Sequence, residues 1–276
     1  MNHDLSPLLE EWPFEPGSIN VRIIQGDNQE PKIQVRLDLG IIQMTTEGRP
    51  DGKRPHGFAS LLEYFEHQID ESQMLTPDSE SFDDQEIAGG EQEAEAFDKS
   101  ENQPADHFKL SGDDCQALRE EAAQYYHRYV ALLVLEDYEG VIRDTSRNLR
   151  VADLCRDYAE EQSDRTVLEQ VRPYILMMRA RACASQALKD DEPKAAVLAV
   201  EEGLEALRQH FDNIGEPKEF EESREAEMLR AMREALVPKL PVSQRAELRE
   251  RLQEAINREN YELAAILRNE LRMLGD

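Results

Sequence analysis

The sequence is short of cysteine, of aromatic residues, of long apolar runs and of positive charge. Of its 276 residues only 6% are aromatic, and 32 Lys and Arg stand against 59 Asp and Glu, for a net charge of −27. No stretch approaches ~18 uninterrupted apolar residues, so we expect no transmembrane helix and no membrane partner. A chain this acidic lacks the basic face that neutralises phosphates, so we expect no direct binding to nucleic acid.

The three cysteines give no sign of metal or redox chemistry. Cys115, Cys155 and Cys183 form no CxxC pair, which excludes a zinc ribbon or a dithiol centre built from adjacent thiols. Cys155, in Leu154-Cys155-Arg156, and Cys183, in Ala182-Cys183-Ala184, look like small buried apolar positions, so we expect core cysteines. The N-terminus lacks a basic stretch followed by an apolar one, so we expect no signal peptide and a reducing, cytoplasmic location.

Charge and periodicity divide the chain into four predicted parts of a mainly α protein. Residues 1–70 form a small α+β segment with a β-hairpin, and residues 71–112 form an acidic linker. Residues 113–237 form an α-helical body, and residues 241–276 form a C-terminal antiparallel helical hairpin.

The acidic linker, residues 71–112, holds 12 acidic and two basic residues and shows neither a helical nor a strand period. Like charges repel and little apolar surface can be buried, so we expect disorder. The simpler interpretation is a solvated spacer. The alternative is a decoy or partner-docking segment, for which Phe82, Ile87 and Phe97 are the only anchors.

Residues 18–46 alternate between apolar and polar on both sides of a turn-rich gap at 26–31, which predicts the β-hairpin. Its second arm is expected to continue through Met44 after a bend at Gly40. A short helix with Leu61, Leu62, Tyr64, Phe65 and Ile69 follows. A hairpin alone is marginal in water, so it must pack on this helix, on another strand or on the helical body.

The connection between hairpin and helix holds three of the first 70 residues' six basic side chains, Arg49, Lys53 and Arg54. An anion-binding loop is one interpretation, although no GxxxxGK[ST] or GxGxxG phosphate cradle is present. A structural connection is the favoured one. His56 has no partner at metal-ligand spacing, so we do not expect a metal site.

Apolar residues recur at helical spacing from Asp113 onward. Pro173 falls inside one of the predicted helices, which must therefore start near Val171 or kink there. Met177, Met178, Met228 and Met232 are expected in the core, and Tyr125, Tyr126 and Tyr129 along one helix–helix seam. The predicted helices cover residues 113–136, 138–162, 165–189, 193–211 and 217–237.

Two stretches of the body resemble degenerate tetratricopeptide repeats. The resemblance implies a stack of helix pairs, and a plain α-bundle is the alternative. The copies lie about 55 residues apart rather than 34, counted from Val141 to Ala196. The matching residues are Tyr125, Leu132, Asp137, Tyr138, Glu139, Gly140, Val141 and Leu149 in the first stretch, and Ala180, Cys183, Ala184, Ala187, Ala196, Val200, Gly203 and Leu204 in the second.

The C-terminal 36 residues carry the strongest signal. Ser243 is a good N-cap, and Leu248, Leu252 and Ile256 fall on one stripe of a first helix. A break at 257–260 precedes a second helix, which is apolar on more than one side. A unit this small does not usually hold its own core, so the extra apolar surface must meet the helical body or a partner.

This stretch resembles the UVR motif, the helical hairpin named from UvrB and UvrC of bacterial nucleotide excision repair. The run ENYELAAILRNEL at 259–271 is diagnostic, with Asn269 where the family usually has an acid. The resemblance implies a protein–protein contact, as in the repair proteins, in Clp chaperone subunits and in the activator of protein-arginine kinase. The matching residues are Leu248, Leu252, Ala255, Ile256, Glu259, Tyr261, Glu262, Ala264, Ala265, Leu267, Arg268, Leu271 and Leu274.

The sequence therefore predicts a non-catalytic adaptor with no cofactor. Its partner is expected to be a protein, either another UVR-motif protein or a second copy of the chain. The alternatives are an accessory factor of nucleotide excision repair, acting through a UvrB- or UvrC-like partner, and an adaptor of a Clp-type protease. The predicted partner-binding residues are Leu248, Leu252, Ile256, Tyr261, Leu263, Ile266, Leu267, Arg268 and Leu271.

The acidic linker yields the first prediction. Limited proteolysis of the native chain should cut first between residues 72 and 108. A strongly acidic segment without a helical or strand pattern is expected to be extended, and proteases cleave extended segments first. Gel electrophoresis and mass spectrometry of the earliest products locate the cut. First cleavage within residues 113–237 would contradict the prediction.

Overall fold

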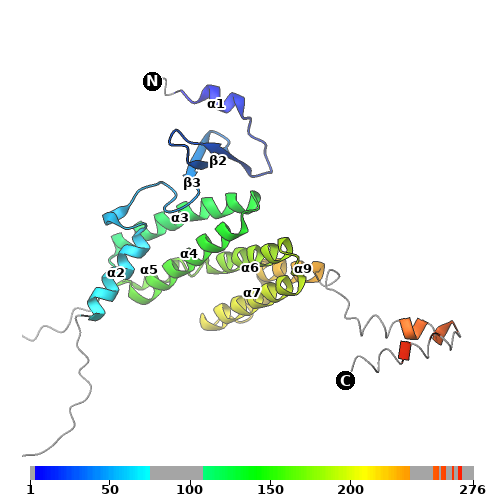
Figure 1. The fold of residues 1–276 in the computed structure, drawn as a ribbon. Helices are drawn as coiled ribbons and strands as arrows, with labels where there is room; N and C mark the ends of the chain where they lie inside the picture. Colours follow the sequence, from blue (N-terminus) through cyan, green and yellow to red (C-terminus); the bar gives the residue numbers. More distant parts are fainter. Residues whose placement is uncertain are drawn as a thin grey trace, which may run out of the picture. The chain divides into compact units, whose positions relative to one another are not determined.

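The computed structural model describes residues 4–74 and 108–236 and, near the C-terminus, residues 251–254, 256–258, 263, 267 and 268 (Figure 1). The chain forms two compact units, Met1–Ala182 and Cys183–Asp276. The elements are α1 (Ser6–Glu11), β1 (Asn20–Gln25), β2 (Pro31–Leu37), β3 (Gly40–Thr45), the 3-10 turn η1 (Pro55–Gly57), α2 (Leu61–Met74), α3 (Gly112–Val134), α4 (Tyr138–Tyr158), α5 (Gln162–Val167), α6 (Arg172–Lys189), α7 (Pro193–Asn213), α8 (Glu219–Glu222) and α9 (Arg224–Leu236).

The N-terminal strands form a three-stranded antiparallel sheet in the order β1-β2-β3. The prediction that the second arm runs on through Met44 was wrong, because the chain reverses at Asp38 and Leu39 and Leu37 pairs with Gly40. The Arg36 guanidinium stabilises this turn by donating to the Leu37 carbonyl and to the carbonyls of Asp38 (3.0 Å) and Gly40 (3.3 Å). A hydrophobic period alone does not show a reversal of this kind.

The two faces of the sheet differ in polarity. On one face the central Ile33 is fully buried, and it pairs with Met44, which is buried too. On the other face Gln34 accepts from Arg22 (2.8 Å) and donates to Gln43 (2.9 Å), and the Arg22 guanidinium lies 4.2 Å from the Trp12 ring centroid. The sheet is thus held by apolar packing on one side and by a polar ladder on the other.

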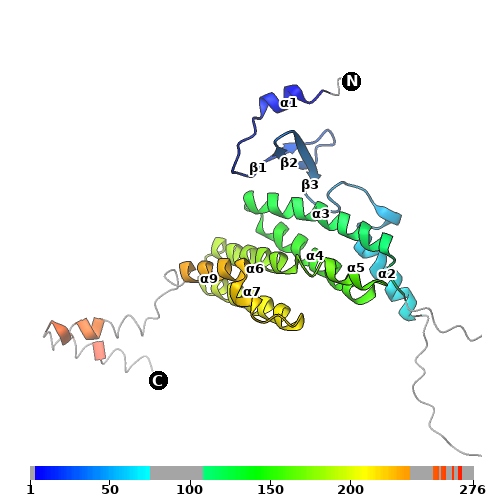
Figure 2. The ribbon, with the colours of Figure 1, turned by 180° about the vertical axis from the view of Figure 1, so that it is seen from behind.

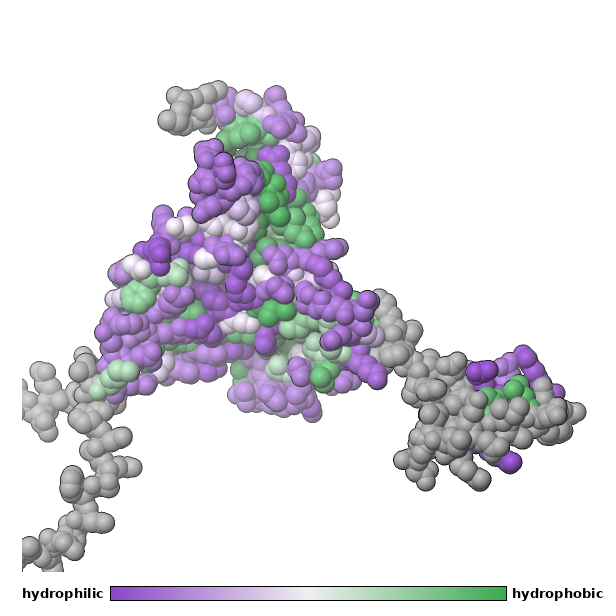
Figure 3. Space-filling model, in the orientation of Figure 1, coloured by the Kyte–Doolittle hydropathy of each residue, from purple (hydrophilic) through white to green (hydrophobic). Residues whose placement is uncertain are grey.

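Helices α3 and α4 pack side by side and form the centre of the first unit (Figures 1 and 2). Ser111 and Asp114 form a capping box at the start of α3, and the Asp137 carboxylate caps α4 by accepting from the Gly140 amide. Helix α2 contributes to the same core, while most of the described surface drawn in Figure 3 is hydrophilic. This core comprises Leu62, Phe65, Ile69, Leu110, Cys115, Leu118, Ala122, Val151, Ala152, Leu154, Cys155, Ala159 and Leu168.

The acidic linker was predicted too long at both ends. Residues 71–74 continue α2, and Leu110 is fully buried. The Leu110 amide donates to the Tyr158 carbonyl (2.9 Å), and the Leu110 carbonyl accepts from the Glu160 amide (3.0 Å). These two hydrogen bonds fix Leu110, which follows the acidic stretch, to the end of α4. The remainder of the predicted segment, 75–107, lies outside the described residues.

The breaks between the later helices fall close to the predicted ones. The predicted helix 165–189 is two elements, α5 and α6, and Pro173 stands in the first turn of α6, where its missing amide is tolerated. In the second unit Pro193 opens α7, which packs against α9. Met177 and Met178 are buried as predicted, whereas Met228 is 45% exposed and does not belong to the core.

A glycine sets how closely α4 approaches the end of α3. A Cβ on Gly140 would lie 2.8 Å from Leu132 Cδ1, and Leu132 is itself buried. Overpacking against the buried Leu132 should cost Gly140→Ala roughly 1–3 kcal/mol, of which the better helix propensity of Ala returns up to ~1 kcal/mol. Gly112→Ala is the matched control, since its Cβ meets only an ordinary 3.6 Å contact. Denaturant unfolding of both variants checks this, and equal midpoints would contradict it.

Candidate functional site

A buried carboxylate joins three segments of the first unit. Glu121 on α3 is fully buried, and both its oxygens accept from the Leu61 amide at the start of α2, at 3.2 and 3.0 Å. Arg49 Nε lies 2.7 Å from Glu121 Oε2, and Arg147 on α4 donates to Oε1. Glu121 thus holds α2, α4 and the loop that follows β3.

A second buried ion pair lies two helical turns further along α3. Arg128 on α3 makes two hydrogen bonds to the Asp144 carboxylate, at 2.6 and 2.8 Å, and both residues are at most 1% exposed. The same guanidinium donates to the carbonyls of Gly48 (2.7 Å) and Thr45 (3.3 Å). Arg143 joins by donating to Asp144 at 3.0 Å. Bidentate charge-assisted pairs of this kind fix geometry as well as charge.

These contacts decide the interpretation of the basic loop at Arg49. Its guanidinium pairs with the buried Glu121 and, at 2.9 Å, with Asp51. At this residue the loop is a structural connection, as favoured from the sequence, and not an anion-binding loop. His56 stacks on Tyr64 with ring centroids 4.2 Å apart. In the described part of the chain no group of three or more His, Cys, Asp or Glu residues could hold a metal ion.

Sequence reasoning missed this charge network, although a signal was present. Glu121 and Arg128 occupy the buried stripe of α3, where an amphipathic helix normally carries apolar residues. Asp144 and Arg147 do the same on α4, three residues apart. Charges of opposite sign at core positions of consecutive helices indicate buried pairing, because an unpaired buried charge is very costly.

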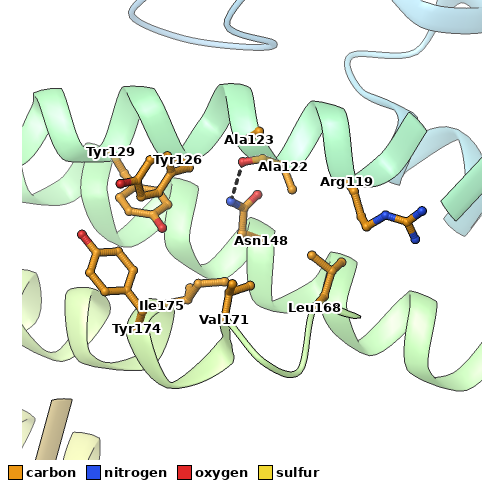
Figure 4. Close-up of a pocket in the computed structure, with 10 residues that line it drawn as sticks. All are labelled: Arg119, Ala122, Ala123, Tyr126, Tyr129, Asn148, Leu168, Val171, Tyr174 and Ile175. Carbon is orange, nitrogen blue, oxygen red and sulfur yellow. Dashed lines mark hydrogen bonds between the residues drawn. The ribbon is translucent and has the colours of Figure 1, made fainter. Parts of the chain in front are cut away.

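The first unit also has an apolar cavity of about 320 Å³ between α3, α4 and the chain that runs from α5 into α6 (Figure 4). At one end Arg119 pairs with Asp164 at 2.6 Å. Near the middle Asn148 donates to the Ala122 carbonyl at 2.9 Å. The lining residues are Arg119, Ala122, Ala123, Tyr126, Tyr129, Asn148, Leu168, Val171, Tyr174 and Ile175.

The predicted single tyrosine seam is two separate environments. Tyr126 and Tyr129 lie edge to face, with centroids 5.5 Å apart, and face Tyr174 across the cavity (Figure 4). Tyr125 instead lies beneath Arg128 and Arg147, whose guanidinium carbons are 4.8 and 4.1 Å from its ring centroid. Adjacent residues on a helix point in different directions, so three nearby tyrosines need not share one face.

Burial keeps the ionisable groups of this core in their ordinary protonated forms. Desolvation raises the pKa of Tyr129, and also the pKa of Tyr174, so both phenols are neutral near pH 7. Burial raises the pKa of Cys155 to about 12, and Cys115 is shifted in the same direction. Cys115 and Cys155 are buried core thiols, as predicted, whereas Cys183, also expected in the core, is only partly buried. A raised pKa keeps the two buried thiols protonated near pH 7.

Five of the nine predicted partner-binding residues are described. Leu267 is 2% exposed, whereas Ile256 and Leu263 are 44% and 40% exposed. Leu252 is half-buried and Arg268 exposed. Residues 251–254, 256–257, 263 and 267–268 are helical, as the predicted hairpin requires. Leu248, Tyr261, Ile266 and Leu271 lie outside the described residues.

Comparison with known families agrees with this reading of the C-terminus. A family described as the UvrB/uvrC motif matches residues 243–276. The chain carries a UVR motif. This motif is associated with protein interaction and with DNA repair. No curated protein and no solved structure matches the chain, so the tetratricopeptide-like character of residues 113–237 stays a prediction. No helix among the described residues is long and apolar enough to cross a membrane.

The buried carboxylate yields a stability prediction. Glu121→Gln keeps the side-chain shape but leaves Arg49 and Arg147 without their shared counter-charge. Breaking a buried ion pair typically costs ~3–5 kcal/mol, and we expect a loss of that order. Glu120→Gln is the matched control, one residue away on the exposed face of α3. Urea unfolding measures both variants, and equal free energies of unfolding would contradict the role assigned to Glu121.

Proposed function

We propose that the protein is a non-catalytic adaptor that binds a protein partner through its C-terminal UVR motif. The observation that carries the proposal is the uneven burial of three apolar residues in this motif. Leu267 is 2% exposed, while Ile256 and Leu263 keep 44% and 40% of their surface open to solvent. One apolar position thus serves packing within the protein, and two remain for a partner.

The proposed partner is a second UVR-type hairpin, on another protein or on a second copy of this chain. An apolar stripe on a short helix is best covered by a complementary apolar helix, as in other helix-in-groove contacts. The polar residues around the stripe include the Glu254–Arg258 pair, whose charged atoms are 2.5 Å apart. Such a polar rim contributes orientation more than affinity.

Direct action on DNA is not part of the proposal. The net charge of −27 opposes binding to a polyanion, so a role in nucleotide excision repair would require a UvrB- or UvrC-like partner that binds the DNA. A Clp-type protease adaptor would use the same hairpin on a different partner. Identification of the captured protein decides between these two pathways.

The test separates hairpin folding from partner binding. Ile256→Asp puts a charge on the exposed stripe and should lower partner affinity by at least about tenfold, with helix content unchanged, because a buried unpaired charge is strongly disfavoured. Leu267→Ala should instead open a cavity and cost roughly 2–5 kcal/mol of hairpin stability. Pulldown with quantitative mass spectrometry measures binding, and circular dichroism measures helix content.

The controls are Arg251→Gln, an exposed change in the same helix, and the truncation 1–240, which removes the motif. Arg251→Gln should bind as the wild-type chain does, and the truncation should capture none of the hairpin-dependent partners. If Ile256→Asp and the truncation both capture the same partners with wild-type affinity, the binding site does not lie in the UVR motif.

A further inference from the structure

A second cavity of the first unit, of about 400 Å³, is rich in positive charge. It lies between the loop after β3, the start of α2, α3 and α4, and four guanidinium groups and the carboxylates of Glu63 and Asp144 line it. Just outside the lining, Glu121 pairs with Arg147 and Glu66 with Arg150. In a chain of net charge −27, four arginines around one cavity are unusual. The lining residues are Gly48, Ala59, Ser60, Leu62, Glu63, Tyr125, Arg128, Arg143, Asp144, Ser146, Arg147 and Arg150.

Three of the four arginines come from one helix. Arg143, Arg147 and Arg150 follow each other at spacings of four and three residues along α4, so they share one face of it. Arg143 and Arg150 have side chains 45% and 57% exposed, while Arg147 is buried beneath them. The positive charge therefore extends from the solvent into the interior of the unit.

The two exposed arginines keep hydrogen-bond donors available. Arg143 uses Nε for Asp144 and one terminal nitrogen for the Thr46 carbonyl (3.1 Å), and Arg150 uses Nε and one terminal nitrogen for Glu66. Within the described part of the chain, the other terminal nitrogen of each makes no hydrogen bond. A guanidinium presents five N–H donors in a planar fork, which suits it to a second oxyanion.

The buried arginine below them keeps one donor unpaired. Arg147 shares Glu121 with Arg49, and among the described residues its buried Nε has no hydrogen-bond partner. Desolvation, together with the charges of Arg150 and Arg49, lowers the pKa of Arg147 to about 9. An anion bound above it would offset this charge.

We propose that this cavity binds the phosphate group of a small phosphate monoester. A monoester carries about −1.5 to −2 charge near pH 7 and three acceptor oxygens, so it can accept from several of these arginine donors at once, whereas a carboxylate has only two oxygens. The cavity volume lies in the ~300–1,000 Å³ range of small-molecule sites, well above the size of a phosphate ion. Ser60 and Ser146 add hydroxyl groups, and Leu62 and Tyr125 offer an apolar wall to the organic part.

The probe is glycerol phosphate, compared with inorganic phosphate and with chloride at constant ionic strength and pH 7.5. Calorimetry on the full chain should show saturable binding of the ester, and thermal unfolding should move to higher temperature as binding saturates. Chloride should give neither effect. Tighter binding of inorganic phosphate than of the ester would overturn the assignment to a monoester. Equal effects of all three salts would overturn the site.

Variants at the cavity mouth locate the binding. Arg143→Gln and Arg150→Gln should each weaken ester binding about tenfold through loss of a charge-assisted contact. Arg156→Gln is the matched control, since this α4 arginine pairs with Asp153 and Asp157 and does not line the cavity. Equal affinity in all three variants, or equal loss in all three, would overturn the proposal.

A gain-of-binding variant guards against misfolding. Glu63 on α2 is exposed and contributes one of the two negative charges of the lining. Glu63→Gln should strengthen ester binding by about two- to fivefold, a result that an unfolded variant cannot give. Glu71→Gln, on the same helix and outside the cavity, should leave the affinity unchanged. Weaker or unchanged binding in Glu63→Gln would contradict the electrostatic basis of the site.

Discussion

The first unit depends on the cost of burying charge. Glu121 and Asp144 are almost completely inaccessible to water, and a carboxylate in that position is tolerable only when positive partners surround it. Arg49, Arg128 and Arg147 supply those partners from the loop after β3, from α3 and from α4. The sheet, α2 and the helix pair therefore adopt one arrangement, since any other would separate buried opposite charges.

This requirement explains how a chain with 39% hydrophobic residues specifies a defined core. Apolar packing is not directional, and a small sheet could rest on a helix pair in several ways. Arg128 limits how the sheet can be placed on the helix pair, because its guanidinium donates to Asp144 on α4 and to the carbonyls of Thr45 and Gly48 beside β3. A shift of the loop by one residue would leave those donors unpaired. The geometry of the buried ion pairs thus selects one arrangement of sheet and helices, which the modest apolar core alone does not.

The sequence predicted the local secondary structure better than it predicted the candidate site. The helix from Pro193, the break at Pro173 and the UVR motif followed from proline positions, period and residue identity. The third strand was missed because its turn is stabilised by Arg36, a contact that periodicity does not encode. The arginine-lined cavity was missed for a related reason. Its residues come from segments up to about 100 positions apart, and only the fold brings them together.

The buried Leu110 gives the acidic stretch before it a particular topology. Ile69, near the end of α2, and Leu110 belong to the same core, and Phe65 and Phe108 approach each other with ring centroids 6.3 Å apart. Both ends of the stretch are therefore fixed to one body, so it is closed as a loop and does not connect separate domains. Closing a loop costs only ~0.6 kcal/mol more for each doubling of its length. Large changes in the length of the stretch between Met74 and Phe108 should therefore cost little stability, so this length is almost independent of the fold that carries it.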